Sequence, residues 1–294
     1  MNKKFSLKDF LKRFSNDEMC LMEIYRKRYP KGVNCSNCKQ LRKYYPLKGR
    51  TTFSCGFCAT QISPLTDTVF EHSAVSLRLW FYAMFLMVKT RSGISAKQLE
   101  RELGVSYKTA HRMFKMIRKL MEQDGSMLNG IVEIDETFVG GKGKNRAYQW
   151  KGGVEEKEVV WGAVERRGRT YLKHVRSTEK YTLLKELKEH VSTQAQIMSD
   201  EAGAYKNLYD FGYYNHNTVI HSNNEYVRGL IHNNSIENIW SHLKRGIYGV
   251  YRHVSKEYLQ SYVNEYAFRF NYRNWDSGMF EILLNRVTVV KPAE

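Results

Sequence analysis

The chain has 294 residues, with 47 lysines and arginines against 30 aspartates and glutamates, which gives a formal net charge of +17. Its plentiful aromatic residues, few prolines and lack of low-complexity segments exclude a disordered protein and predict one large or two to three small folded domains. No signal peptide is recognisable, and the apolar stretch at residues 77–88 is too short to span a bilayer. We therefore expect a cytoplasmic protein without a membrane partner.

The positive charge is concentrated in two blocks. Residues 1–60 hold 14 Lys/Arg against 4 Asp/Glu, and residues 91–120 hold 8 against 2, so the rest of the chain is nearly neutral. Charge that served only solubility would be spread more evenly. The distribution predicts a nucleic-acid-binding N-terminal region joined to a separate body.

Four of the five cysteines form the pattern C-x2-C-x16-C-x2-C, namely Cys35, Cys38, Cys55 and Cys58. Each pair suits a tight knuckle that turns two thiolates toward one ion, and two such knuckles complete a tetrahedral Zn²⁺ site. A cytosolic setting argues against disulfides. We predict that residues 1–66 form an N-terminal helix and a four-cysteine zinc ribbon, and the basic residues around it favour DNA contact over a purely structural role.

Residues 67–126 have a helical period and predict a second domain. Ser95 can cap one helix, Gly104 makes a turn, and Ser106 can cap a longer basic helix. This is the pattern of a helix-turn-helix, in which the second helix reads DNA. An ordinary helical hairpin with a solvated basic face is the alternative. The predicted DNA-binding residues of the second helix are Lys108, His111, Arg112 and Lys115.

Residues 127–294 predict an α/β catalytic domain. Strand-like segments occur at residues 131–139, 158–165, 169–176, 195–199 and 214–220, with helix-like segments at 181–191 and 204–211 and later in the chain. The order βββαβαβα gives a mixed sheet with helices packed on it, and it is the order of the RNase H-like fold.

Three acidic residues fall on separate elements of this domain. Asp135 lies in the first strand, Asp200 at the end of the fourth strand, and Glu237 in a late helix. Three carboxylates on separate elements suit a two-metal phosphoryl-transfer site, because each divalent ion takes hard oxygen ligands from several directions. Lys244 lies seven residues after Glu237 and therefore on the same helix face.

Asp200 and Glu237 could each have a structural role instead of a catalytic one. Asp200 could cap the following helix. Glu237 could close a capping box with Asn234, which requires no catalysis.

Further basic residues near the acids are candidate DNA contacts. A glycine-rich loop after the first strand carries Lys142, Lys144 and Arg146, and Arg245 lies in the helix of Glu237. The loop lacks the Walker spacing of a phosphate cradle, so we interpret it as a loop that grips DNA.

With these motifs the chain resembles the ISXO-like family of DDE-type insertion-sequence transposases, which carry an N-terminal zinc ribbon and belong to the retroviral-integrase and RNase H-like superfamily. The resemblance covers nearly the whole chain. It rests on the ribbon and on three segments: IDETFVGGKGK, SDEAGAY and HNNSIENIWSHLKRGIYGVYRHVSKEYLQSYVNEYAFRFNYR.

The resemblance implies that Asp135, Asp200 and Glu237 hold two Mg²⁺ (or Mn²⁺) ions and that Lys244 contacts DNA near the scissile phosphate. Water would nick the transposon end to free a 3′-OH, and this hydroxyl would then attack the target DNA. The implied partners are double-stranded transposon-end and target DNA, so the protein would be nucleoid-associated. Since two ends must meet, we expect a homodimer or larger assembly.

Two other functions remain open from the residues. The chain could be a DNA-binding regulator in which the ribbon and helix-turn-helix bind a promoter and the RNase H-like body is not catalytic. It could also be a stand-alone metal-dependent nuclease that cuts DNA without joining it.

Overall fold

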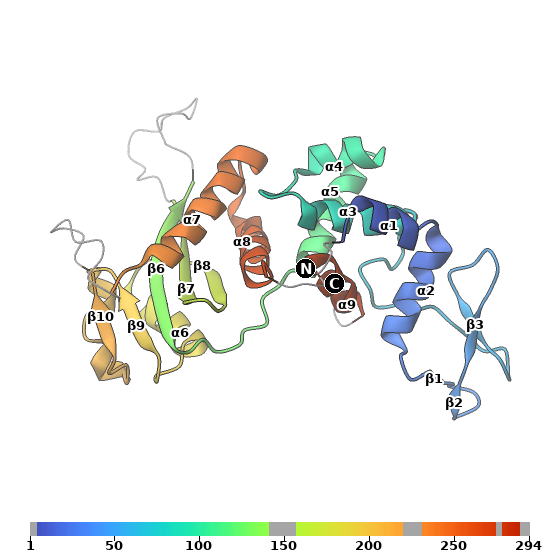
Figure 1. The fold of residues 1–294 in the computed structure, drawn as a ribbon, viewed down its shortest axis with the longest axis horizontal. Coiled ribbons are helices and arrows are strands. Elements are labelled where there is room, and N and C mark those ends of the chain that lie inside the picture. Colours follow the sequence, from blue (N-terminus) through green and yellow to red (C-terminus); the bar gives the residue numbers. More distant parts are fainter. Residues whose placement is uncertain (1–4, 141–156, 220–230, 275–277, 289–294) are drawn as a thin grey trace. The chain divides into compact units, whose positions relative to one another are not determined.

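The computed structural model describes residues 5–140, 157–219, 231–274 and 278–288 (Figure 1). The chain divides into two compact units. The first comprises Met1–Leu120 and Asn274–Glu294, and the second comprises Met121–Arg273. Within the described parts of the chain, no helix combines the length and the apolar character that a membrane span requires.

The first unit opens with two capped helices and a small set of strands. Ser6 and Asn16 cap α1 (Leu7–Arg13) and α2 (Asp17–Arg28) by accepting bonds from backbone N–H groups of the first turn. Five short strands follow, forming an antiparallel pair β1–β2 and a three-stranded antiparallel sheet β3–β4–β5. Their bounds are β1 (Val33–Asn34), β2 (Leu41–Arg42), β3 (Tyr44–Pro46), β4 (Phe53–Cys55) and β5 (Gln61–Ile62).

Three helices complete the N-terminal part of this unit: α3 (Leu77–Lys89), α4 (Ala96–Leu103) and α5 (Tyr107–Lys119). The predicted caps of the last two are confirmed, since the Ser95 and Ser106 side chains accept from the Gln98 and Thr109 N–H groups. Gly104 ends α4 with φ +63°, a left-handed conformation that glycine adopts without strain.

The C-terminal helix α9 (Gly278–Val287) belongs to the first unit, whereas we assigned it to the catalytic domain from the sequence. The physical reason is an aromatic cluster. The Phe280 ring packs against rings from α1, α3 and the preceding turns, with centroid distances of 5.9 Å to Phe10 and 5.8 Å to Phe14. Hydrophobic burial of this kind has no sequence-local pattern from which the partner could be read.

A five-stranded mixed sheet forms the second unit, with the order β10–β9–β6–β7–β8. The strands are β6 (Ile131–Val139), β7 (Glu158–Glu165), β8 (Thr170–Val175), β9 (Gln196–Ser199) and β10 (His216–Thr218). Both pairs of the β6–β7–β8 meander are antiparallel, while β9 is parallel to β6 and β10 is parallel to β9. The predicted mixed α/β sheet and the order of its strands are confirmed.

Helices cover both faces of this sheet. On one face, α6 (Lys180–His190) packs with Val132 and Ile134 of β6. On the other, α7 (Asn234–Gly246) and α8 (Lys256–Asn271) pack against β7 and β8. A π-helical turn, Ile247–Tyr251, joins α7 to the loop before α8.

The segment between β9 and β10 differs from the predicted short helix. It forms two 3-10 segments, Gly203–Tyr205 and Leu208–Phe211, separated by Asn207 with φ +61°. A left-handed residue at that position interrupts any continuous helix.

Candidate active site and zinc centre

The four ribbon cysteines come together as predicted. Their sulfur atoms all lie within 4.8 Å of one another, and none of them is in a disulfide. The Cys35 and Cys58 sulfurs are 3.5 Å apart, and those of Cys38 and Cys55 are 4.0 Å apart. Zn–S bonds of about 2.3 Å in a tetrahedron place sulfurs about 3.8 Å apart. The donor set therefore fits a zinc ion in both chemistry and spacing.

Two of the basic residues beside the ribbon make hydrogen bonds within the first unit. Lys27 donates to Glu281 at 3.1 Å and to Asn285 at 2.7 Å, and Arg28 donates to the Pro64 carbonyl at 2.9 Å. Their charges hold α2 to α9 and to the chain after β5. They are consequently less available to a partner than the exposed Lys43, Lys48 and Arg50.

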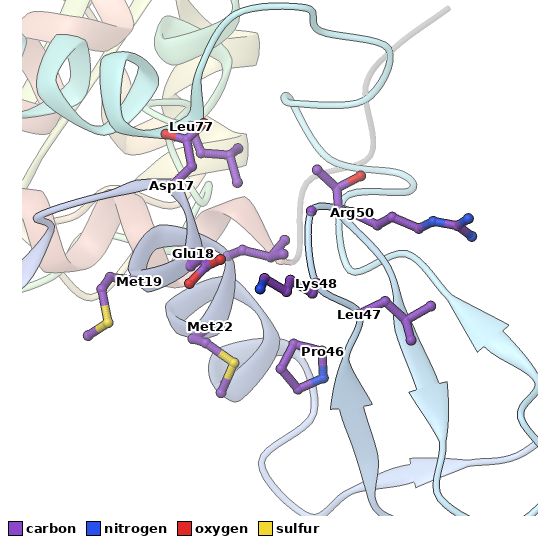
Figure 2. Close-up of a pocket in the computed structure, with 12 residues that line it drawn as sticks. Asp17, Glu18, Met19, Met22, Pro46, Leu47, Lys48, Arg50 and Leu77 are labelled. Carbon is purple, nitrogen blue, oxygen red and sulfur yellow. The ribbon is translucent and has the colours of Figure 1, made fainter.

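A cavity of about 620 Å³ lies between α2 and the turn that joins β3 to β4 (Figure 2). Apolar side chains such as Met22 and Leu47 line it, and Lys48 and Arg50 stand on the ribbon side. None of the predicted carboxylates or zinc ligands lines it. It is therefore separate from both candidate centres.

The predicted faces of α5 agree with its burial. Lys108, Arg112 and Lys115 are exposed and His111 is half-buried, whereas the opposite face, which includes Met113, packs inward. The basic residues of α5 therefore lie on its more exposed face. The other predicted DNA contacts Lys142, Lys144 and Arg146 lie outside the described residues.

The alternation of β6 separates its acids onto two faces. Glu133 and Asp135 face α7, since each bonds to a residue of that helix. Glu136 faces the other way, where its carboxylate accepts from the Tyr205 hydroxyl. Asp135 thus faces α7, the helix that carries Glu237, whereas Glu136 does not.

The indole of Trp240 fixes the Asp135 carboxylate. Trp240 Nε1 donates to Asp135 Oδ2 at 2.8 Å. The ring can approach because Gly162, the β7 partner of Asp135, has no side chain, and a Cβ there would lie 2.5 Å from the ring. Glycine is required here by the close contact rather than by its backbone angles.

Burial first, and then the nearby charges of Asp200 and Glu136, raise the pKa of Asp135 to about 7 despite the lowering effect of the Trp240 hydrogen bond. In this environment the ionised form of a carboxylate is destabilised unless a cation lies close to it. The electrostatics of Asp135 therefore favour a bound cation.

Asp200 directly follows β9, the strand that pairs with β6. The last paired residues of β6 and β9 are Glu133 and Met198. Continuing this parallel register by two residues places Asp135 opposite Asp200, on the same face of the sheet. Asp200 Oδ1 accepts from the Ala202 N–H at 3.0 Å, which is a local turn bond rather than the helix cap considered as its alternative role.

Asn233 connects Asp200 to the start of α7. With its side-chain amide oriented so that both atoms are paired, its oxygen accepts from the Asp200 N–H at 3.1 Å and its nitrogen donates to the His232 carbonyl at 3.1 Å. The end of β9 and the beginning of α7 are therefore tied together at the predicted site.

The alternative role of Glu237 as a capping-box residue is not found. The N-cap of α7 is Asn233, one residue before the position that the box requires, and its side chain makes no cap bond. Glu237 is exposed and lies one turn from both Asn233 and Trp240, the residues that contact Asp200 and Asp135. Lys244 follows one turn after Trp240 and is half-buried.

The three acids do not gather as tightly as the cysteines. Among the described residues, the groups of three or more ligating side chains within 4.8 Å are the cysteines and the α6 group Glu186, Glu189 and His190. A site for two ions about 3.5–4 Å apart spreads its ligands over two coordination spheres, so a wider separation of the three acids is compatible with it.

The predicted DNA contact Arg245 is exposed on α7, and its Nε donates to the Ser241 carbonyl.

Glu133 is a residue whose role sequence reasoning missed. Its side chain is fully buried (0% exposed) and accepts from the α7 backbone, at 2.7 Å from Ser235 N and 3.1 Å from Ile236 N. The Arg166 guanidinium neutralises this carboxylate, with Arg166 Nε 2.6 Å from Glu133 Oε1. A carboxylate from β6 thus caps α7 and fixes the helix that carries Glu237. A charged residue two positions before Asp135 in an apolar strand was the available signal.

Replacing Glu133 by alanine is expected to lower the free energy of unfolding by about 3–5 kcal/mol, because it leaves the Arg166 charge and the first α7 amides without their partner. Chemical denaturation measures the change. Glu257→Ala, an exposed acid in the first turn of α8, serves as the control and should stay within about 0.5 kcal/mol of the parent. Equal stability of the two variants would contradict the capping role.

Comparison with known proteins identifies both parts of the chain. Residues 127–271 match the ISXO2-like transposase domain, and residues 15–61 match the transposase zinc-ribbon domain. An uncharacterized protein in the transposable element ISH50 of Halobacterium salinarum is 29% identical over 276 residues, which cover 88% of this chain and 92% of that protein. The first match contains Asp135, Asp200 and Glu237, and the second contains the four cysteines.

Proposed function

Because the chain belongs to the ISXO2-like transposases, we propose that it is a DNA transposase with a two-metal DDE site. It binds transposon ends, nicks them to free 3′-OH groups and joins these to target DNA. The proposal is supported most by the parallel β6–β9 register, which on continuation brings Asp135 opposite Asp200, and by the bonds that tie each of them to α7 through Trp240 or Asn233.

We assign the RNase H-like fold to the second unit. An antiparallel three-strand meander, followed by two strands parallel to its first member, gives the order 5-4-1-2-3 with helices on both faces. In that arrangement acids of the first and fourth strands become neighbours, and a late helix brings a third. Asp135, Asp200 and Glu237 occupy these positions.

Asp135, Asp200 and Glu237 would hold two Mg²⁺ or Mn²⁺ ions, and oxygen ligands of this kind are what these hard cations prefer. When bound, the ions supply Lewis-acid activation of the attacking and leaving oxygens. The chain positions them: Trp240 orients the Asp135 carboxylate, and Glu133 fixes α7. Lys244, on the Glu237 side of α7, contacts the phosphate next to the scissile bond.

The reaction comprises two in-line displacements at phosphorus. Water first attacks the phosphodiester at the transposon end, the P–O3′ bond breaks, and a 3′-OH leaves. This hydroxyl then attacks a target phosphodiester and displaces a second 3′-OH. No covalent bond to the protein forms in either step.

The first unit supplies DNA binding. Within it, α4 and α5 form a helix-turn-helix in which Lys108, His111, Arg112 and Lys115 meet the DNA, and the zinc ribbon adds a second basic module. Arg245, together with Lys142, Lys144 and Arg146, contacts DNA near the catalytic centre. Two ends must be held together, so the active form is a homodimer or larger assembly.

A joining assay tests this function. The protein is given a pre-cut duplex with a free 3′-OH at the transposon end, a supercoiled target plasmid and Mg²⁺. A transposase yields products in which the labelled end is covalently joined to the plasmid. A stand-alone nuclease would release cut DNA without joined products, and a regulator would bind the end and leave both DNAs intact; either outcome would overturn the proposal.

A further inference from the structure

The zinc ribbon presents a surface whose charge has one sign. Residues 31–66 contain six lysines and arginines and no aspartate or glutamate. A module without acids repels other basic surfaces and attracts a polyanion. The partner of this surface is therefore negatively charged along its length, as DNA is.

An exposed aromatic side chain accompanies the basic residues of the ribbon. Phe57, between the two cysteines of the second knuckle, is 76% exposed, and the Arg42 guanidinium covers its ring at 4.7 Å from the centroid. Tyr45 is also exposed and lies against the same knuckle, where a Cβ on Gly56 would come within 2.7 Å of its ring. We call Arg42, Lys43, Tyr45 and Phe57 the knuckle patch.

Hydrogen bonds fix the backbone of the knuckle that carries Phe57. The Gly56 N–H donates to the Lys43 carbonyl at 3.0 Å and the Ala59 N–H to the Cys55 carbonyl at 3.1 Å, and in the sequence Phe57 lies between Cys55 and Cys58 of the four-cysteine group. A fixed phenyl ring in water forgoes about 1.5–3 kcal/mol that burial would provide. An exposed ring on a fixed backbone is therefore suited to contact with a partner.

We propose that the knuckle patch binds double-stranded DNA, with Phe57 inserting into a groove as an apolar wedge and Arg42 contacting the adjacent phosphate. Apolar side chains beside cations make this kind of groove contact, in which the ring packs on sugars and partly unstacks a base step. This inference rests on the DNA-binding part of the proposed function and assigns the residues through which the ribbon contributes to it.

Fluorescence anisotropy of the full chain on a mixed-sequence duplex, measured over a series of salt concentrations, tests the proposal. Phe57→Ala is expected to weaken binding by about 5- to 150-fold, the range found for single base–aromatic contacts, without changing the slope of log affinity against log salt. Arg42→Gln is expected to lower that slope by about one. A 2-aminopurine in the duplex should brighten with the parent chain and less with Phe57→Ala.

The matched control is Tyr181→Ala, which removes an exposed aromatic ring of α6 in the second unit and should bind DNA like the parent. Zinc content and far-ultraviolet circular dichroism report whether each variant is folded, and Phe57→Leu, which keeps an apolar wedge, should recover part of the affinity. Wild-type affinity of Phe57→Ala would overturn the proposal, as would a loss of affinity that occurs only with loss of zinc. A chain that binds through Phe57 but joins no ends would overturn the proposed reaction and leave the knuckle patch intact.

Discussion

Asp135→Asn is expected to reduce both strand cleavage and strand joining by about a thousandfold or more, while the affinity for DNA stays the same. The substitution removes the charge that a cation needs and keeps the side-chain size. The asparagine oxygen can still accept from Trp240 Nε1, so the geometry of α7 persists. Cleavage of a labelled end and joining of a pre-cut end, each in Mg²⁺, measure the two steps separately.

Asp210→Asn is a suitable control, since Asp210 is an exposed acid on the second 3-10 segment and contributes nothing to the site. It should cleave and join DNA like the parent. Full activity of Asp135→Asn would remove the central carboxylate from the mechanism.

Thermal unfolding of Asp135→Asn shows whether this variant has lost only a metal ligand or has a damaged fold. The folded-state pKa of Asp135, raised to about 7, means that the folded protein holds this proton more tightly than the unfolded chain does. The associated stability is present at pH 4 and is lost as the pH rises through 7. Without divalent ions, Asp135→Asn should therefore melt higher than the parent at pH 8, with the difference disappearing near pH 4.

Removal of zinc is expected to have the second large effect. Structural zinc sites contribute about 10 kcal/mol or more to the folding of small domains, and the strands of the ribbon are only two or three residues long. Cys38→Ser, or treatment with a chelator, should unfold the ribbon and abolish its contribution to DNA affinity. Atomic absorption should find one zinc per chain in the parent and none in the variant.

Cys20→Ala is the matched control, because Cys20 is a buried thiol of α2 that lies outside the four-cysteine group. It should retain one zinc and the DNA affinity of the parent. A Cys38→Ser chain that kept both its melting temperature and its DNA affinity would rule out zinc as the organiser of the ribbon.

Local patterns predicted most of the fold. Spacing alone located the cysteine group, and the serines at the starts of α4 and α5 together with Gly104 predicted the helix boundaries, because capping depends on residues within one turn. The apolar periods predicted the strands of the sheet. The three acids were placed on the correct elements for the same reason.

Long-range contacts were not predictable in the same way. Glu133 caps α7 from a strand about a hundred residues earlier, and Phe280 joins an aromatic cluster of the N-terminal unit. Neither partner lies within the reach of a local period. Gly162 also had no sequence signal, since its role depends on the approach of Trp240 across the sheet.

The central claim is that Asp135, Asp200 and Glu237 form one two-metal site, and a crystal structure with Mn²⁺ tests it most directly. The anomalous signal of manganese should reveal two ions, bridged by Asp135, with Asp200 and Glu237 each bound to one of them. Manganese absent from Asp135, or bound only at the α6 group of Glu186, Glu189 and His190, would contradict the claim.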